Sequence, residues 1–366
     1  MLQRLSAFIC HKRRIPLRSV NAVEYVNSML EVIGNTRLLK LNRLGRNLSA
    51  NVFVKLEHLN PSGSYKDRMA LAMVEAAEKG LTWNGRKLRP GGIVCDASAG
   101  NTAPALAFVC AVKGYKAILC AYKTMLHAQK SVRLKITEAF GPEVSQCALP
   151  CENLLEQCAN ERERAYCYIL SGKMQMYELE KENSDVVWVD QIYNWYNVVG
   201  QMEMGREIYK QLDGKIDAWG CSLGSGGTLL GVTLALKDLG VKPVTFGVVP
   251  AEPGSESPEL EELEIRRKLV RFLGLKKWET EQSIAERMFN LGYPSEMFRV
   301  TAEDAREMAN RLCREEGVYC GMSSGANVFG ALKVAERMKA GQNVVTVIVD
   351  RRDRYLDEYP EDIYVT

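Results

Sequence analysis

A series of short apolar runs, separated by helical patterns, most strongly limits the folds open to this chain of 366 residues. The runs are continuous rather than alternately apolar and polar, which is typical of strands buried on both faces of a parallel sheet. The predicted strands are Asn51–Glu57, Gly92–Cys95, Lys116–Tyr122, Val186–Asp190, Ile216–Ser222, Pro243–Val249 and Val344–Val349. One helical pattern covers Ala302–Glu316, where Thr301 and Asp304 make a capping-box-like start. This alternation predicts an α/β fold with open twisted sheets.

The charge of the chain is unevenly placed. Residues 1–22 hold five bases and no acid, so removing them from the total of 48 bases leaves 43 against 45 acids. A nearly neutral body offers no general basic surface for nucleic acid, so we expect no nucleic-acid partner. Because a chain of this length favours two domains, we predict a basic extension over 1–22, one α/β domain over 23–190 and a second over 191–366. The leader partly resembles an organellar transit peptide, and the alternative is an extension retained in a cytoplasmic protein.

The cysteines and the apolar stretches narrow the classes of protein further. The chain has 11 cysteines, most of them in apolar runs, and no evident secretory signal, which indicates free buried thiols in a reducing, cytoplasmic setting. The spacing of Cys147, Cys151 and Cys158 lacks the close pair typical of zinc sites, and only three histidines exist, so no metal is expected. The long uncharged stretch Ala218–Leu236 contains five glycines and makes a poor membrane span, so no membrane association is expected.

Three loops carry residues suited to chemistry, each between a predicted strand and a helix. In open α/β sheets, ligands bind beyond the carboxyl ends of the strands. The first loop, residues 60–68, places Lys66 at a strand–helix junction, where a desolvated amine can form a Schiff base; a solvated surface charge is the alternative. The second, residues 220–228, has closely spaced glycines whose N–H groups can converge on an anion, or which simply make a tight turn. The third, residues 96–102, can bind a carboxylate or merely cap a helix.

Together, and in this order, the three loops resemble those of the cysteine synthase and cystathionine β-synthase family, the fold-type II pyridoxal-phosphate (PLP) enzymes. The resemblance runs from about Ile33-Gly34-Asn35-Thr36 to about Arg354-Tyr355-Leu356, and the segment Asn-Pro-x-x-Ser-x-Lys-Asp-Arg at residues 60–68 matches in full. It implies a tryptophan synthase β-like fold of two open twisted, mostly parallel sheets flanked by helices. It also implies PLP as the cofactor, held by Lys66 as a Schiff base, and a homodimer.

The resemblance further implies a role for each matching residue. Lys66 is the expected catalytic residue. Cofactor binding is expected from Lys66, Asn101, Gly224, Ser225, Gly226, Gly227, Thr228 and Ser323. Among these, residues 224–228 resemble the loop with which the family binds the phosphate of PLP. Asn101 is expected to form a hydrogen bond with the 3′-hydroxyl of PLP, and Ser323 is expected to face its pyridine nitrogen. Substrate binding is expected from Ser98, Ala99, Gly100, Thr102 and Gln191.

These roles lead to an expected reaction. PLP supplies an electron sink, and the protein selects the reaction by orientation and electrostatics. A serine opposite the ring nitrogen does not stabilise a protonated pyridinium, so loss of a β-substituent is favoured. Lys66, once released, is positioned to remove the Cα proton. Elimination followed by addition of a nucleophile to an aminoacrylate is β-replacement, here on a small amino-acid substrate, O-acetylserine or O-phosphoserine.

Departures from the family pattern keep other activities open. Ala99 lacks the hydroxyl usual at its position, and a charged stretch between Pro253 and Met297 replaces a histidine-containing loop. The alternatives are a β-elimination lyase, that is, a cysteine desulfhydrase or serine dehydratase, and a non-enzymatic relic of the family. The arginine-rich tail Asp350–Tyr355 resembles the branch that makes N-(2-amino-2-carboxyethyl)glutamate. Its cations either accept an acidic substrate group or form ion pairs with Asp350, Asp353 and Glu358.

Overall fold

The structure is a computed structural model. It describes residues 25–98, 100–121, 132–147, 155–156, 158, 161–251, 267, 270–271 and 281–356. The basic leader, Ala99 and most of the charged stretch after Pro253 lie outside the described residues.

The larger of two sheets has six strands in the order β1-β2-β10-β7-β8-β9. Its strands are β1 (Leu38–Lys40), β2 (Asn51–Leu56), β7 (Ala218–Ser222), β8 (Val244–Pro250), β9 (Glu296–Val300) and β10 (Asn343–Ile348). All neighbours are parallel except β1, which runs antiparallel to β2. Every residue of the central strand β10 is buried, as expected for a strand covered on both faces.

The smaller sheet has four parallel strands in the order β5-β4-β3-β6. They are β3 (Ile93–Ala97), β4 (Lys116–Ala121), β5 (Glu143–Gln146) and β6 (Val186–Trp188). The structure therefore has the two open, mostly parallel sheets that the sequence predicts, and the α/β fold class is confirmed.

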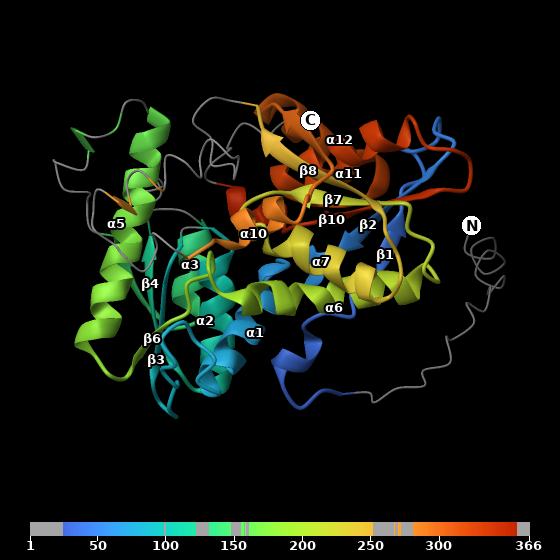
Figure 1. Cartoon of the computed structure of the whole chain (residues 1–366). Coiled ribbons are helices and arrows are strands. Elements are labelled where there is room, and N and C mark those ends of the chain that lie inside the picture. Colours follow the sequence, from blue (N-terminus) through green and yellow to red (C-terminus); the bar gives the residue numbers. More distant parts are fainter. Residues whose placement is uncertain are drawn as a thin grey trace, which may run out of the picture.

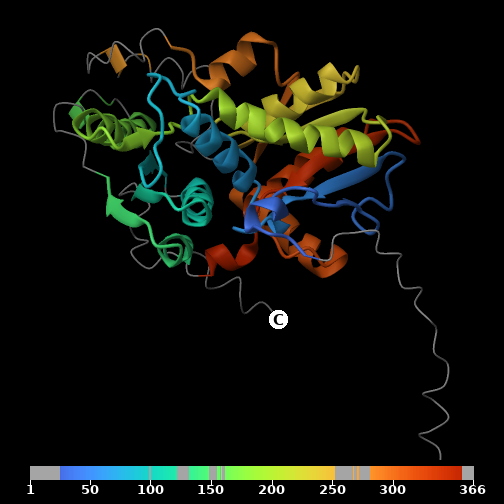
Figure 2. The same ribbon diagram turned by 90° about the horizontal axis from the view of Figure 1, so that it is seen from below.

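Helices cover both faces of each sheet (Figure 1). The helices are α1 (Lys66–Glu78), α2 (Thr102–Lys113), α3 (Val132–Ala139), α5 (Glu161–Glu182), α6 (Trp195–Gln211), α7 (Gly227–Asp238), α10 (Ile284–Asn290), α11 (Ala302–Glu316) and α12 (Met322–Ala335). On the larger sheet, α11 and α12 build one apolar core, and α6 and α7 build the other. On the smaller sheet, α1 and α2 cover one face and α5 covers the other. Helix α1 packs against both α2 and α6, where the two halves of the molecule meet (Figure 2).

All seven predicted strands are present within a few residues of their expected ends. Helix α11 spans Ala302–Glu316 as predicted, and the Thr301 hydroxyl caps it by accepting a hydrogen bond from the Asp304 N–H at 3.0 Å. The prediction missed β1, β5 and β9. Strand β9 alternates between half-buried and exposed residues at the sheet edge, so it lacks a continuous apolar run.

The six-stranded sheet takes strands from both sides of residue 190, because β1 and β2 join β7–β10. The domain boundary at 190 stays a prediction. The described cysteines are free thiols. Within the described ranges, no cluster of three or more potential metal ligands is present. No helix in that part of the chain is both long and apolar enough to cross a bilayer.

Candidate active site

Three segments with candidate site residues or neighbours of such residues leave the same edge of the larger sheet. Strands β2, β10 and β7 are adjacent and parallel, so their carboxyl ends lie side by side. The Lys66 loop follows β2, the tail 349–356 follows β10, and the glycine loop 223–227 follows β7. A site at this edge is the arrangement expected for open α/β sheets.

The Lys66 loop is closed by its own side chains. Asp67 accepts hydrogen bonds from the Ser62 N–H at 2.7 Å and from the Ser62 hydroxyl. Gly63 has φ +88°, a conformation that suits glycine, and an added Cβ would lie 2.8 Å from the guanidinium of Arg354. Lys66 is the first residue of α1, and these contacts fix the loop that precedes it.

The surroundings of the Lys66 amine make it less basic than an ordinary lysine. Burial lowers the pKa of Lys66 to about 8. Its Nζ lies 5.0 Å from the centroid of the Tyr65 ring, and it has no hydrogen-bond or ion-pair partner among the described residues. A larger fraction of this amine is therefore neutral and nucleophilic near pH 8 than for an ordinary lysine.

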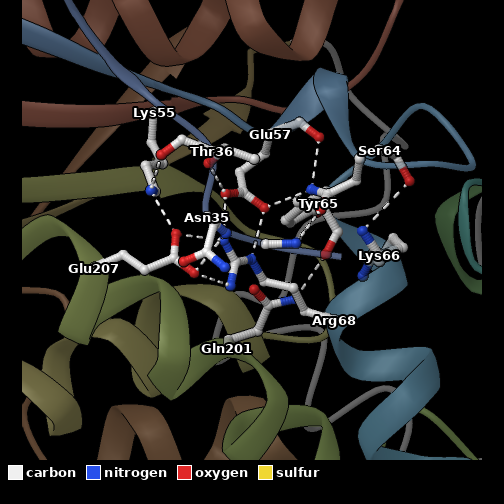
Figure 3. A network of polar contacts seen from close by, with 12 residues as sticks. Asn35, Thr36, Lys55, Glu57, Ser64, Tyr65, Lys66, Arg68, Gln201 and Glu207 are labelled. Atoms are coloured by element: carbon white, nitrogen blue, oxygen red, sulfur yellow. Dashed lines mark hydrogen bonds and ion pairs between the residues drawn. The ribbon is translucent and has the colours of Figure 1, made fainter. Parts of the chain in front are cut away.

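A buried ionic network lies beneath this loop (Figure 3). Arg68, two residues after Lys66, donates to both carboxylate oxygens of Glu57 and both of Glu207, each at 2.8 Å. The fully buried Lys55 donates to Glu207 at 2.6 Å. Burial would raise the pKa of Glu207, but its bonds to Arg68 and Lys55 outweigh burial and lower that pKa to about 2. The network joins α1, β2 and α6 under the lysine.

The glycine loop has the form of an anion site. Gly226 has φ +84° and forms the N-cap of α7. Within the described residues, none of the backbone N–H groups of Gly224–Thr228 donates to a protein acceptor. A Cβ at Gly227 would lie 2.2 Å from Oδ1 of Asn197, whereas a Cβ at Gly224 would meet nothing within 4 Å. Free N–H groups at a helix N-terminus are suited to a phosphate.

The predicted substrate loop follows β3 in the smaller sheet. Ser98 is buried, and its hydroxyl accepts a hydrogen bond from the Gly100 N–H at 3.2 Å. Thr102 donates to Oε1 of Gln191 at 2.6 Å. The structure thus brings Thr102 and Gln191 together, although they lie 89 residues apart in sequence.

Asn101 is held by the tail of the chain. Its amide Nδ2 donates to Asp350 at 2.5 Å, and its Oδ1 accepts from Arg354 at 2.6 Å. Ser323 lies in the first turn of α12 and is half-buried, while the adjacent hydroxyl of Ser324 accepts from the Val349 N–H at 2.9 Å. The roles of Asn101 toward a 3′-hydroxyl and of Ser323 toward a ring nitrogen stay predictions.

Sequence reasoning assigned no role to two amides of α6 that join the loops. Asn197 donates to the Gln191 carbonyl at 2.8 Å and to the Ser225 hydroxyl at 3.0 Å, so it connects Gln191 to the glycine loop. Gln201, one turn later, donates to the carbonyl of Tyr65 at 3.2 Å. The sequence signal that could have indicated them is their spacing, because side chains four residues apart are neighbours on one face of a helix.

Comparisons with known proteins identify the family of the chain. The family model described as "Pyridoxal-phosphate dependent enzyme" matches residues 29–350. Cysteine synthase 1 of Emericella nidulans is 34% identical, over 93% of this chain and 86% of the relative. Cysteine synthase B of Salmonella typhimurium is 33% identical, over 90% of this chain and 95% of the relative.

Solved structures are similar over nearly the whole chain. A hydrogen sulfide-producing enzyme from Fusobacterium nucleatum has a TM-score of 0.70 and 27% identity, covering 91% of this chain and 99% of the other. O-ureido-L-serine synthase has a TM-score of 0.71 and 25% identity, covering 93% of this chain and 96% of the other.

Proposed function

We propose that this chain, which belongs to the cysteine synthase family of fold-type II PLP enzymes, replaces the activated oxygen substituent of a serine derivative with a sulfur nucleophile. The family establishes a PLP-dependent enzyme of the β-replacement type acting on a small amino acid. The observation that carries the proposal is the half-buried Lys66 amine, which has no hydrogen-bond or ion-pair partner among the described residues and lies at the sheet edge from which the glycine loop also leaves. O-acetylserine and O-phosphoserine are the proposed substrates.

The residues present fit PLP. The cofactor needs a reactive amine and a cradle for its phosphate, and it needs a polar partner for its ring. The structure has Lys66 with a lowered pKa, N–H groups of residues 224–228 that bond no protein acceptor within the described ranges, and Asn101 at the start of α2. Lys66 would hold the cofactor, the glycine loop would hold its phosphate, and Ser323 would face its ring nitrogen. When bound, PLP supplies an electron sink conjugated with the substrate Cα.

Lys66 is the proposed base. At pH 7.5, a pKa of about 8 leaves about a quarter of the amine neutral, against about 0.1% for an ordinary lysine with a pKa near 10.4. A neutral Nζ can accept the Cα proton of the substrate and later return it. Burial thus prepares one amine for both covalent linkage and proton transfer.

The substrate carboxylate is proposed to bind between the start of α2 and Gln191. The Thr102 hydroxyl donates to Oε1 of Gln191 and so fixes the orientation of the carboxamide. The Nε2 donor of Gln191 then faces away from Thr102 and is left for an anionic ligand. Asp96, the first residue of the loop 96–102, accepts a hydrogen bond from the Gln191 N–H at 3.4 Å. These contacts support orientation of the substrate by two elements of the smaller sheet.

The test is a product analysis on the purified holoenzyme. O-acetylserine, O-phosphoserine, serine and cysteine would each be supplied with and without sulfide, and cysteine, pyruvate and the leaving group would be measured. We expect cysteine in amounts equal to the released acetate or phosphate, and we expect Lys66→Ala to abolish turnover. Failure of every donor to release its β-substituent would overturn the proposal.

A second candidate activity is β-elimination, in which nothing adds at Cβ and the released aminoacrylate is hydrolysed by water to pyruvate and ammonia. It is supported by the likeness to the hydrogen sulfide-producing enzyme and by Ala99, which has no hydroxyl in the loop expected to bind substrate. Pyruvate and sulfide formed from cysteine alone, faster than any replacement reaction, would favour this activity.

The third activity, transfer to an acidic amine nucleophile, depends on free cations in the tail. Arg351 pairs with Asp353 at 2.6 Å, and Arg354 is buried against Asn101 and the Ser62 carbonyl. These partners support a structural use of two of the three tail arginines, so the sulfur nucleophile is preferred.

A homodimer is proposed for the holoenzyme. Tyr25, Val26, Met29 and Val32 stay exposed along the start of the described chain, although Leu30 and Ile33 beside them pack on the core beneath α1 and α2. Exposed apolar side chains gathered on one segment favour a protein contact. Light scattering after size exclusion would give about 82 kDa, twice the 41.0 kDa of the chain, and a mass of one chain would refute the dimer.

A further inference from the structure

The tail after β10 contacts every loop expected to touch the PLP ring. Its backbone lies between two of them, because Asp350 forms a β-bridge with Ser64 and Arg351 forms one with Cys320. The Arg351 N–H donates to the Gly63 carbonyl at 3.3 Å, and the Gly321 N–H donates to the Asp350 carbonyl at 3.2 Å. The tail therefore joins the Lys66 loop to the segment that begins α12.

Side chains of the same tail hold the third loop. Arg354 is 1% exposed and donates through one terminal nitrogen to Asn101 and through the other to the carbonyl of Ser62. Asp350, fully buried, accepts from Asn101 and from the Tyr355 hydroxyl, both at 2.5 Å. Both ends of the Asn101 amide are thus bonded by two residues about 250 positions away.

Two glycines provide the space for these side chains. A Cβ at Gly63 would lie 2.8 Å from the Arg354 guanidinium, and a Cβ at Gly321 would lie 2.4 Å from the Asp350 carboxylate. The tail side chains therefore occupy positions that the two neighbouring loops are shaped to accept.

Burying Arg354 and Asp350 in this way lowers the stability of the fold. Among the described residues, the buried guanidinium of Arg354 forms no ion pair, and Oδ1 of Asp350 has no hydrogen-bond partner. Buried charges without direct ionic partners destabilise a fold relative to apolar groups. A role in orienting Asn101 accounts for these buried groups better than a role in packing.

We propose that Arg354 and Asp350 are positioning residues that fix the Asn101 amide with one N–H directed to the 3′ oxygen of the cofactor. The inference rests on the proposed function, which supplies that oxygen. Arg354 bonds Oδ1, so the amide cannot turn over, and Asp350 takes one of the two N–H groups, leaving the other. The cationic donor on Oδ1 also polarises the amide and strengthens its remaining N–H as a donor.

The test compares PLP with 3-deoxypyridoxal phosphate, which lacks the 3′ oxygen. Each would be titrated into the full-length chain freed of cofactor, and the ratio of the two dissociation constants would be measured. We expect a ratio of about tenfold or more in the wild type, as for one hydrogen bond to a charged group. In Arg354→Met the ratio should fall below about threefold, because the amide is free to turn over.

Matched variants separate positioning from folding. Arg351→Met alters an exposed arginine of the same tail and should leave the ratio unchanged. Arg354→Lys keeps the buried charge but cannot donate to Asn101 and Ser62 together, so its ratio should also fall if Arg354→Met does not fold. In Asn101→Ala the ratio should be low, and adding Arg354→Lys should not lower it further.

Each outcome has a distinct meaning. An Arg354→Lys ratio equal to that of the wild type, with both cofactors weakened alike, would make Arg354 a structural residue and overturn the inference. A wild-type ratio near one would overturn it as well, by removing the bond from Asn101 to the 3′ oxygen. The proposed function fails separately, when the wild type releases no β-substituent from any donor.

Discussion

The buried network under Lys66 gives a prediction whose size can be worked out from the structure. Glu207 lies between Arg68 and Lys55, and these bonds lower its pKa from the usual 4.5 to about 2. A difference of about 2.5 pKa units corresponds to about 3 kcal/mol of folding free energy at pH 7. Glu207→Gln keeps the size of the side chain but removes this charge, and it leaves Lys55 buried beside neutral acceptors only.

The expected result is a lower melting temperature. For a chain of 366 residues, about 3 kcal/mol corresponds to about 4 °C. Because the folded pKa of Glu207 is depressed, its contribution is complete above the unfolded pKa and is lost as the pH falls toward 2. Between pH 7 and pH 4, the wild type should lose about 0.8 kcal/mol of this contribution, so the gap between wild type and variant should narrow.

Circular dichroism melts of the cofactor-free chain at both pH values measure this effect. Glu203→Gln is the control, since Glu203 lies one turn earlier on α6 and pairs with Arg206 at an exposed position. Exposed pairs contribute about 0–1 kcal/mol, so this control should melt within about 1 °C of the wild type. Equal losses in the two variants, or none in Glu207→Gln, would refute the account of the network.

Three further predictions concern the cofactor cradle and one helix. The rate at which PLP loads onto the cofactor-free chain, followed by absorbance, should rise with pH to a midpoint near 8, because only the neutral Lys66 amine reacts; a midpoint near 10 would contradict the lowered pKa. Gly227→Ala should weaken PLP binding by about tenfold or more, since its Cβ would press on Asn197, whereas Gly224→Ala should bind normally; equal titration curves for the two would contradict this. Thr301→Ala should destabilise the protein by about 1 kcal/mol through loss of the α11 cap, measured by urea unfolding, and a Thr301→Ser protein that is equally destabilised would argue against capping.

Local sequence patterns were enough to predict the central strands and the loops with reactive groups. Central strands such as β10 are buried on both faces, so their apolar runs are continuous and recognisable without any partner. The Lys66 loop and the glycine loop were also predictable, because glycine, proline and helix-start residues encode local backbone geometry. The edge strand β9 was not, because only one of its faces meets the core.

Only the tertiary structure determined which of these strands and loops contact one another. Strand β10 lies between β2 and β7 although nearly 290 residues separate β10 from β2, and no local pattern specifies that order. The same holds for the bonds from Arg354 to Asn101 and from Asn197 to Ser225. An arginine in a polar tail or an asparagine on a helix has the same local signature whether it faces solvent or a loop. Its partner is fixed by the packing of whole helices and sheets, and that packing depends on contacts distant in sequence.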